Sequence, residues 1–343
     1  MSAEKVLVTG ASGFIAKHCI AELLRRDYEV RATVRNLART DDTRRGIEQA
    51  GASSDTVAFV AADLLNDDGW DEAMAGCTYV LHVASPFPMQ NPKDEDEVIR
   101  PAREGAVRVL KAAQRAGVKR VVLTSSIVAV TLPWPEAPTG HVFDEADWTN
   151  PKRPDITTYI KSKTLAEQAA WDLVRGMPGG PELTVVNPAF VLGPVPDGNL
   201  STSQEVLRLM AEGAYPAAPK VGFPISDVRD VAVTHALAMT HPDAAGERFL
   251  TANGFMRLIE IDLASATTAM TLNSPHHKVA FGTLASKASG IVAAAFLRSD
   301  KEHSVGDGGD FGQTVLHGVG EGVNKIPDER KSFRVRGQVV RVP

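Results

Sequence analysis

The sequence is poor in the residues that staple small secreted folds or build metal centres. It contains only two cysteines among 343 residues, and Cys19 and Cys77 stand in apolar segments without the short spacing of zinc ligands or of a disulfide framework. Three histidines, His276, His277 and His303, have no cysteine or paired carboxylate at ligand spacing, so we expect no metal site. Two isolated thiols in apolar surroundings are typical of small packed side chains in a reducing compartment.

The sequence also lacks a strong charge bias and any long apolar run. Its formal net charge is -5, and charged residues make up 23% of the chain, which gives no electrostatic reason to expect nucleic acid or an anionic membrane as partner. No apolar run approaches the roughly 20 residues that span a bilayer, and the first residues lead into an apolar strand without the pattern of a signal peptide. We therefore expect a cytoplasmic protein, a monomer or homodimer, that binds small molecules.

What the sequence does contain is a strand, a glycine turn and a helix at its beginning. An aliphatic run leads into VTGASGFIA, and an amphipathic stretch follows to about residue 26. Gly10 permits a tight turn, Gly13 lets the backbone approach a pyrophosphate on the helix N-terminus, and Ala16 allows close packing of helix on strand. The pattern predicts a dinucleotide-binding unit. Further strands are predicted at residues 29–34, 57–61, 79–84, 120–124 and 183–187, and helices at 94–116, from 159, at 203–212 and at 228–240.

The second predicted strand is followed by Arg35 rather than by an acid. An acid at this place would hydrogen-bond the ribose 2′-hydroxyl of NAD, whereas a guanidinium binds a 2′-phosphate through two hydrogen bonds. The sequence therefore favours NADPH over NADH, with Arg31 and Arg39 as further candidates. Asp63 and Leu64 follow the third strand, where they would meet an adenine; a turn or a helix cap is the other interpretation of Asp63.

Two pairs of polar side chains are candidates for the chemistry. Ser125 and Ser126 end the fifth predicted strand, and ligands of an open parallel sheet lie at the carboxyl ends of its strands. Tyr159 and Lys163 stand four residues apart at the start of a predicted helix, so both lie on one face. A cation beside a phenol lowers the pKa of the tyrosine, which makes this pair a proton donor for carbonyl reduction; a chance pattern on an exposed helix is the alternative.

These motifs together resemble one family. The segments that carry the likeness are VTGASGFIA, Arg35, HVASP at 82–86, LTSS at 123–126, YIKSKTLAEQAAW at 159–171, VNPAFVLGP at 186–194 and SDVRDVA at 226–232. They are similar to the dihydroflavonol reductase and cinnamoyl-CoA reductase branch of the extended short-chain dehydrogenases, over about residues 4–258. The resemblance implies an α/β fold, a Rossmann doubly wound parallel sheet with a smaller C-terminal substrate-binding lobe.

The resemblance also implies roles for individual residues. Ser126 would hydrogen-bond the substrate carbonyl, Tyr159 would donate the proton, and Lys163 would lower the pKa of the tyrosine and hold the nicotinamide ribose. The implied cofactor-binding residues are Gly10, Gly13, Phe14, Ile15, Arg35, Asp63, Leu64, Ala84, Ser85, Thr124, Lys163 and Pro188. Two positions depart from the family: Ala16 replaces a common glycine, and Asp42 stands near a second basic residue of some plant members.

The second half of the chain carries fewer signals. Candidates for the wall of a hydrophobic substrate pocket are Phe87, Met89, Trp134, Phe190 and Tyr215, with local packing as the other interpretation. We expect residues 1–190 to form the NADP-binding domain, including the catalytic residues, and 191–261 to form part of the substrate lobe. Beyond residue 261 the sequence becomes rich in Ala, Ser, Thr and Gly, which predicts an atypical tail, 262–343, that is disordered or frame-shifted.

The predicted function is NADPH-dependent, reversible reduction of a hydrophobic aldehyde or ketone. One alternative is an NAD-dependent sugar-nucleotide epimerase or 3β-hydroxysteroid dehydrogenase/isomerase. Arg35 argues against the epimerase, because such enzymes prefer an acid after the second strand. The other alternative is a redox sensor that binds NADP without catalysis, and such proteins commonly lose the tyrosine and lysine that this chain retains.

Overall fold

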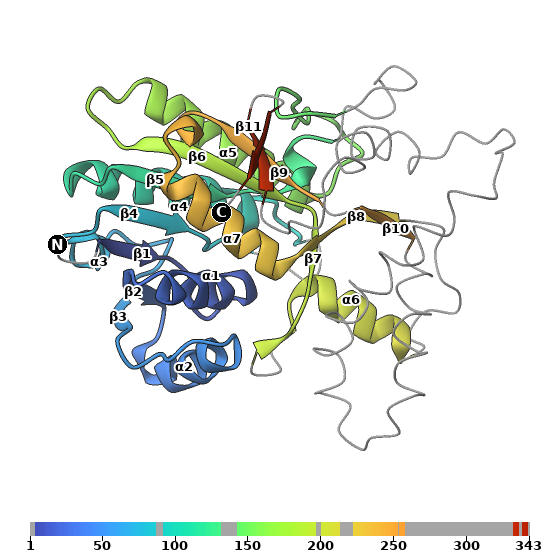
Figure 1. The fold of residues 1–343 in the computed structure, drawn as a ribbon. Helices are drawn as coiled ribbons and strands as arrows, with labels where there is room; N and C mark the ends of the chain where they lie inside the picture. The colour runs from blue at the N-terminus through green and yellow to red at the C-terminus, as the bar shows by residue number, and fades with distance from the viewer. Residues whose placement is uncertain are drawn as a thin grey trace, which may run out of the picture.

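One sheet of seven parallel strands organises the fold. The computed structural model describes residues 4–86, 92–131, 143–196, 200–212, 222–252 and 254–257, and the backbone of 332–335 and 338–341. The strands are β1 (Lys5–Val8), β2 (Glu29–Val34), β3 (Ala58–Ala61), β4 (Tyr79–His82), β5 (Arg120–Thr124), β6 (Glu182–Pro188) and β9 (Arg248–Thr251). Their order is β3-β2-β1-β4-β5-β6-β9, and every neighbouring pair is parallel (Figure 1).

The strand order changes direction between β1 and β4. The chain builds outward through β2 and β3, then returns to place β4 on the other side of β1. In open parallel sheets the ligand crevice lies at such a switch point, outside the carboxyl ends of the strands. Gly10 follows β1 and Ala84 follows β4, so both lie at this crevice.

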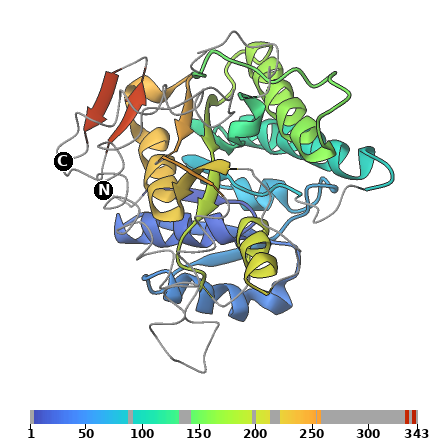
Figure 2. The same ribbon diagram turned by 90° about the vertical axis from the view of Figure 1, so that its right-hand side faces the viewer.

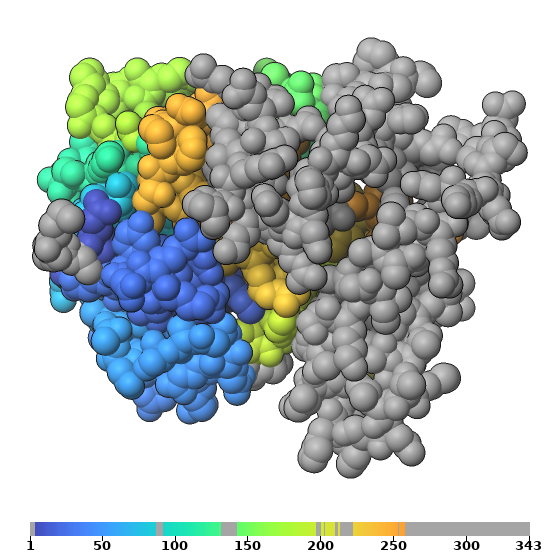
Figure 3. All heavy atoms as spheres, in the orientation of Figure 1, coloured from blue at the N-terminus to red at the C-terminus, as the bar shows by residue number. Residues whose placement is uncertain are grey.

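Helices cover both faces of the sheet. On one face lie α1 (Phe14–Arg25), α2 (Thr40–Gln49) and α7 (Val228–Thr240); on the other lie α3 (Trp70–Met74), α4 (Asp96–Arg115) and α5 (Thr158–Arg175). Strand side chains alternate between the two cores: Val6 and Val8 join the first, and Leu7 joins the second. Figure 3 shows α1 and α7 packed side by side on the surface of the first face.

A smaller unit lies beyond the carboxyl ends of the central strands. It contains a three-stranded sheet in the order β10-β8-β7, from β10 (Phe255–Arg257), β8 (Gly222–Asp227) and β7 (Phe190–Leu192), with α6 (Thr202–Ala211) packed against β7. Figure 1 shows this unit to one side of the seven-stranded sheet, and in Figure 2, turned by 90°, it lies in front of the sheet. Its partly buried apolar side chains gather around Leu207 of α6.

The predicted Rossmann architecture is confirmed, and five of its strands lie within about two residues of the predicted bounds. Sequence reasoning missed β9, which adds a seventh strand, and the three-stranded sheet. Because β9 and α7 belong to the central sheet and its covering layer, the two units interleave along the chain. The division at residues 190 and 261 stays a prediction. Of the predicted tail, the described part is a hairpin of β11 (Ser332–Val335) and β12 (Gln338–Arg341), with β11 next to β9.

Gly10 should tolerate no side chain. It has φ +69°, and a Cβ there would meet the Cα of Ala84 at 2.9 Å, whereas Gly117 has φ +68° with nothing within 4 Å of its Cβ position. We expect Gly117→Ala to lose about 1 kcal/mol of unfolding free energy from the left-handed backbone alone. Gly10→Ala should lose an additional ~1–3 kcal/mol from overpacking two backbones. Equilibrium urea denaturation measures both, and equal losses would show that the approach of Ala84 is unimportant.

Candidate active site

Tyr159 and Ser126 meet at the carboxyl edge of the sheet. Thr157 caps α5 by accepting from the amide of Ile160 at 3.4 Å, which starts the helix just before Tyr159. Ser126 caps the 3-10 turn Ile127–Ala129 that follows β5. A side-chain hydrogen bond joins the two hydroxyls. A phenol and a serine hydroxyl therefore lie close enough together to donate hydrogen bonds to one carbonyl oxygen.

Burial controls the charge state of Tyr159. Its side chain as a whole is partly exposed, but burial around the hydroxyl raises the pKa to about 12, and the hydrogen bond from Ser126 opposes this rise. The phenol is thus protonated at neutral pH, which is the state needed to give up a proton. The expectation that Lys163 and an oxidised nicotinamide lower the pKa of Tyr159 remains a prediction for the complex with cofactor.

Lys163 lies one helical turn beyond Tyr159, between α5 and the sheet. Only 7% of its surface is exposed, and Nζ lies 3.5 Å from the carbonyl oxygen of Thr124. Burial lowers the pKa of the ammonium to about 8, while the charge of Glu167 acts in the opposite direction. Lys163 lines a pocket together with His82, Ala84, Ser85, Thr124 and Glu167.

Two buried histidines next to this pocket are held neutral. Burial lowers the pKa of His82 to about 3 and that of His235 to about 4, and the Lys163 charge adds to the effect on His82. His235 Nδ1 lies 2.7 Å from the carbonyl oxygen of Val231, so Nδ1 carries the proton and Nε2 accepts from the Thr124 hydroxyl at 2.7 Å. These contacts fix the end of β5 against α7.

The glycine turn after β1 fits a pyrophosphate. Gly13 is the N-cap of α1 and offers no side-chain cap, and the first helical turn carries no acid. The free amide groups of that turn, including those of Phe14 and Ile15, therefore remain available to an anion. The side chains of Phe14 and Ile15 instead pack with Val228 and its neighbours under the small unit.

Arg35 stands exposed directly after β2. No hydrogen bond or ion pair engages it within the described ranges, whereas Arg39 and Arg45 pair with Asp42. The negative charge of Asp42, which departs from the family pattern, is therefore compensated locally. Arg31 donates to three carbonyl groups at the end of α3, so this further candidate for the 2′-phosphate is committed elsewhere.

The remaining predicted cofactor residues line the same edge. Asp63 accepts from the amide of Leu65 at 2.9 Å, so one of its carboxylate oxygens stabilises a turn, as the second interpretation of this residue expected. Leu64 packs against Gly105 of α4. Ala84 donates its amide to Thr9 Oγ1 at 3.0 Å. Pro188 is buried at the end of β6, opposite Thr251 of β9.

Comparison with known proteins decides the family. The model of the NAD dependent epimerase/dehydratase family matches residues 6–251. The chain belongs to this family. It is 36% identical to cinnamoyl-CoA reductase 1 of Petunia hybrida over 260 residues, which cover 75% of this chain and 74% of the petunia protein. It is 38% identical to dihydroflavonol 4-reductase of Zea mays over 217 residues, which cover 62% of this chain and 59% of the maize protein.

A solved structure agrees with these relatives. Gre2 of Candida albicans, in complex with NADPH, aligns with a TM-score of 0.69 at 28% identity and covers 78% of this chain and 84% of Gre2. The resemblance to the dihydroflavonol and cinnamoyl-CoA reductases is confirmed. As a member of the epimerase/dehydratase family with reductases as relatives, the chain is an NAD(P)-dependent oxidoreductase of small molecules.

Of the predicted substrate wall, the structure describes Phe190 alone. Its ring stacks on Phe223 of β8, with centroids 5.0 Å apart and planes 15° apart. The other four candidates, Phe87, Met89, Trp134 and Tyr215, lie outside the described residues, as do the histidines 276, 277 and 303. In the part of the chain that the structure describes, no cluster of His, Cys, Asp or Glu could hold a metal ion, and no helix is long and apolar enough to cross a bilayer.

Sequence reasoning missed Glu167, Asn187 and Arg248, which form a buried polar network behind the catalytic candidates. A signal for the first was present: Tyr159, Lys163 and Glu167 follow one another at intervals of four and therefore share one helical face. The pairing with Arg248, by contrast, spans 81 residues and leaves no local pattern.

The Lys163 ammonium should titrate near pH 8 in the protein without cofactor, because its burial disfavours the charged form. Exposed lysines should titrate around 10.4. ¹³C NMR of lysines labelled at Cε measures each midpoint, with the Lys163 resonance assigned by its loss in Lys163→Arg. A Lys163 midpoint that coincides with those of exposed lysines would contradict the burial argument.

Proposed function

We propose that the protein is an NADPH-dependent reductase of hydrophobic aldehydes and ketones, in which Tyr159 donates the proton. The observation that carries this proposal is the hydrogen-bonded pair Ser126–Tyr159, with the buried ammonium of Lys163 one turn beyond it. The pair lies at the end of β5, at the same carboxyl edge of the sheet where the glycine turn follows β1.

The residues have distinct tasks in this reaction. When bound, the reduced nicotinamide supplies the hydride. Negative charge then develops on the substrate oxygen, and the hydroxyls of Ser126 and Tyr159 stabilise it because both donate to that one atom. Tyr159 passes its proton to this oxygen, and the positive charge of Lys163 stabilises the phenolate that is left. Because the pKa of Tyr159 is about 12 before the reaction, its phenol carries the proton at neutral pH.

Two features favour a reductase over an epimerase or a sensor. Arg35 stands exposed where an acid would bind the ribose of NAD, and the relatives include proteins named as reductases. A sensor has no need of a proton donor, a carbonyl-binding serine and a buried lysine in one place. The stacked rings of Phe190 and Phe223 and the printed names of the relatives support a bulky, hydrophobic carbonyl compound as substrate.

Tyr159→Phe should lower kcat by about a hundredfold or more, because general acid catalysis contributes on the order of 10²–10⁴. Affinity for NADPH should stay within about twofold, since the phenol hydroxyl is a small part of the binding surface. NADPH consumption with a panel of aldehydes and ketones measures the first, and fluorescence titration measures the second. Tyr28→Phe, which removes a phenol hydroxyl at the amino end of β2, is the matched control. Near-normal turnover of Tyr159→Phe would remove this residue from the mechanism.

Arg35→Ala should raise the KM for NADPH by about ten- to a hundredfold, the effect of losing a charge-assisted contact worth ~1.5–3 kcal/mol. The KM for NADH should change little, because NADH lacks the 2′-phosphate. Arg39→Ala removes an arginine that is already paired with Asp42 and serves as the control. Equal losses with both cofactors, or none with either, would refute the proposed NADPH preference.

A further inference from the structure

Glu167 is a fully buried carboxylate on the catalytic helix. It lies one turn beyond Lys163 and two beyond Tyr159, and none of its surface is exposed. A buried carboxylate is costly unless it is paired and hydrogen-bonded. Four donors surround this one, and they come from β6, β9, α5 itself and the end of β5.

The two oxygens of Glu167 serve different partners. Oε2 accepts from Ser125 Oγ at 2.5 Å and from Asn187 Nδ2 at 2.8 Å. Oε1 accepts from Arg248 Nε at 2.6 Å and from Trp171 Nε1 at 3.4 Å. Oε2 therefore binds Ser125, the residue before the candidate catalytic serine, and Oε1 binds Arg248, the counter-ion of the carboxylate.

Asn187 bridges Glu167 and the backbone of Ser126. Its Nδ2 also donates to the backbone carbonyl oxygen of Ser126 at 3.1 Å. Both hydrogens of this amide are thus used, and a flipped amide would place its oxygen against the carboxylate. Ser125 is held by side chain and Ser126 by backbone, so both serines after β5 are fixed to α5 through Glu167.

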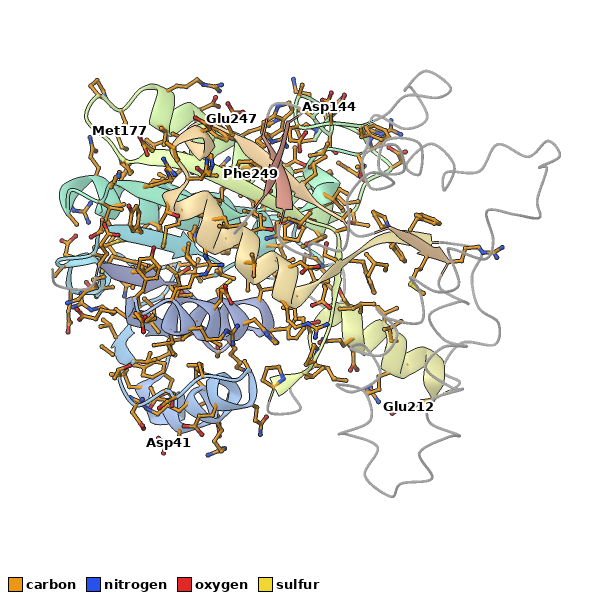
Figure 4. All side chains as sticks on the ribbon, viewed as in Figure 1. Asp41, Asp144, Met177, Glu212, Glu247 and Phe249 are labelled. Carbon is orange, nitrogen blue, oxygen red and sulfur yellow. The ribbon has the colours of Figure 1, made fainter. Side chains whose placement is uncertain are left out.

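Arg248 anchors the network on the far side. Strand alternation turns Phe249 into the core with α1 and α7, so Arg248 faces α5. Its Nη1 donates to the carbonyl oxygens of Glu145 at 2.9 Å and Asp147 at 2.7 Å, and its guanidinium lies 3.9 Å from the ring centroid of Trp148. Figure 4 labels Glu247 and Phe249, the chain neighbours of Arg248 at the start of β9, and Asp144 of the loop that it binds.

Glu167 also acts on Lys163 through its charge. Titratable groups that line the pocket of Lys163 are His82 of β4 and Glu167 of α5; Tyr159 precedes it by one turn, and the pocket wall formed by α4 contributes Ala102 and Ala106. His82 is held neutral by burial. Glu167 is therefore the carboxylate that stabilises the ammonium, against the desolvation that opposes it.

We propose that Glu167 is a positioning residue of the active site, which keeps Lys163 charged and fixes Ser125 and Ser126 at the end of β5. This inference rests on the proposed function for its consequence in catalysis, while the charge of Lys163 can be measured without turnover. A carboxylate that only stabilised the fold would leave the titration of Lys163 unchanged.

The test compares Glu167→Gln with Glu182→Gln. Glu182 is the partner of another buried arginine, Arg120, at the amino edge of the sheet, so both variants leave a buried guanidinium without its carboxylate. In Glu167→Gln the NMR midpoint of Lys163 should fall by about one pH unit or more, the size of effect expected from a near opposite charge. The alkaline limb of kcat/KM should move down by the same amount. In Glu182→Gln both should stay at their normal values.

Failure of this inference and failure of the proposed function give different results. An unshifted Lys163 midpoint in Glu167→Gln overturns the inference, even in an active enzyme. Absence of NADPH turnover by the unaltered protein overturns the function, even where the midpoint shifts. Should Glu167→Gln not fold, Glu167→Gln/Arg248→Gln carries the same comparison, because no unpaired charge remains in the pair. If neither variant folds, Glu167 has a purely structural role and the inference is wrong.

Discussion

Charge buried between α5 and the sheet is the constraint on which the site depends. Lys163 and Glu167 lie on the inner side of this helix, 7% and 0% exposed. Ionised groups in such surroundings cost several kcal/mol each unless partners compensate for lost water. The compensation comes from strands far apart in sequence, because their carboxyl ends meet at one edge. Satisfying the two charges therefore requires β5, β6 and β9 to be in place, which ties the chemistry to the completed fold.

The parts of the site that could be predicted are those with local signals. Gly10 and Gly13 stand between a strand and a helix, Ser126 follows an apolar run, and Tyr159 and Lys163 are separated by one turn. Each of these patterns depends on residues within one element, where spacing in sequence fixes spacing in space. The partners of Glu167 had no such pattern, since Arg248 is 81 residues away and only the register of β6 with β9 brings them together.

The limits of the fold prediction have the same origin. β2 and β5 were predicted with the bounds that the structure gives them, because most residues of each are apolar or β-branched and each ends at a turn. β7 and β10 have three residues each, which is too short for a period to show. In β9 a charged residue, Arg248, points inward, which is the opposite of what binary patterning expects. Its burial follows from the ion pair, and the ion pair follows from tertiary structure.

The two buried arginines of the central sheet show why position along a strand decides function. Arg120 opens β5 at the amino edge, pairs with Glu182 and donates to the last carbonyl groups around α7. Arg248 opens β9, pairs with Glu167 and donates to a loop beside α5. Both arginines donate hydrogen bonds to backbone carbonyl oxygens that would otherwise lack a donor after they are buried away from water. The register of β9 places Arg248 opposite Val185 of β6, where it reaches Glu167. Glu167 in turn lies one helical turn from Lys163 on α5. Arg120–Glu182 and Arg248–Glu167 are thus ion pairs of the same kind. The first joins strands at the amino edge of the sheet, whereas the charge of the second acts on the candidate catalytic residue Lys163.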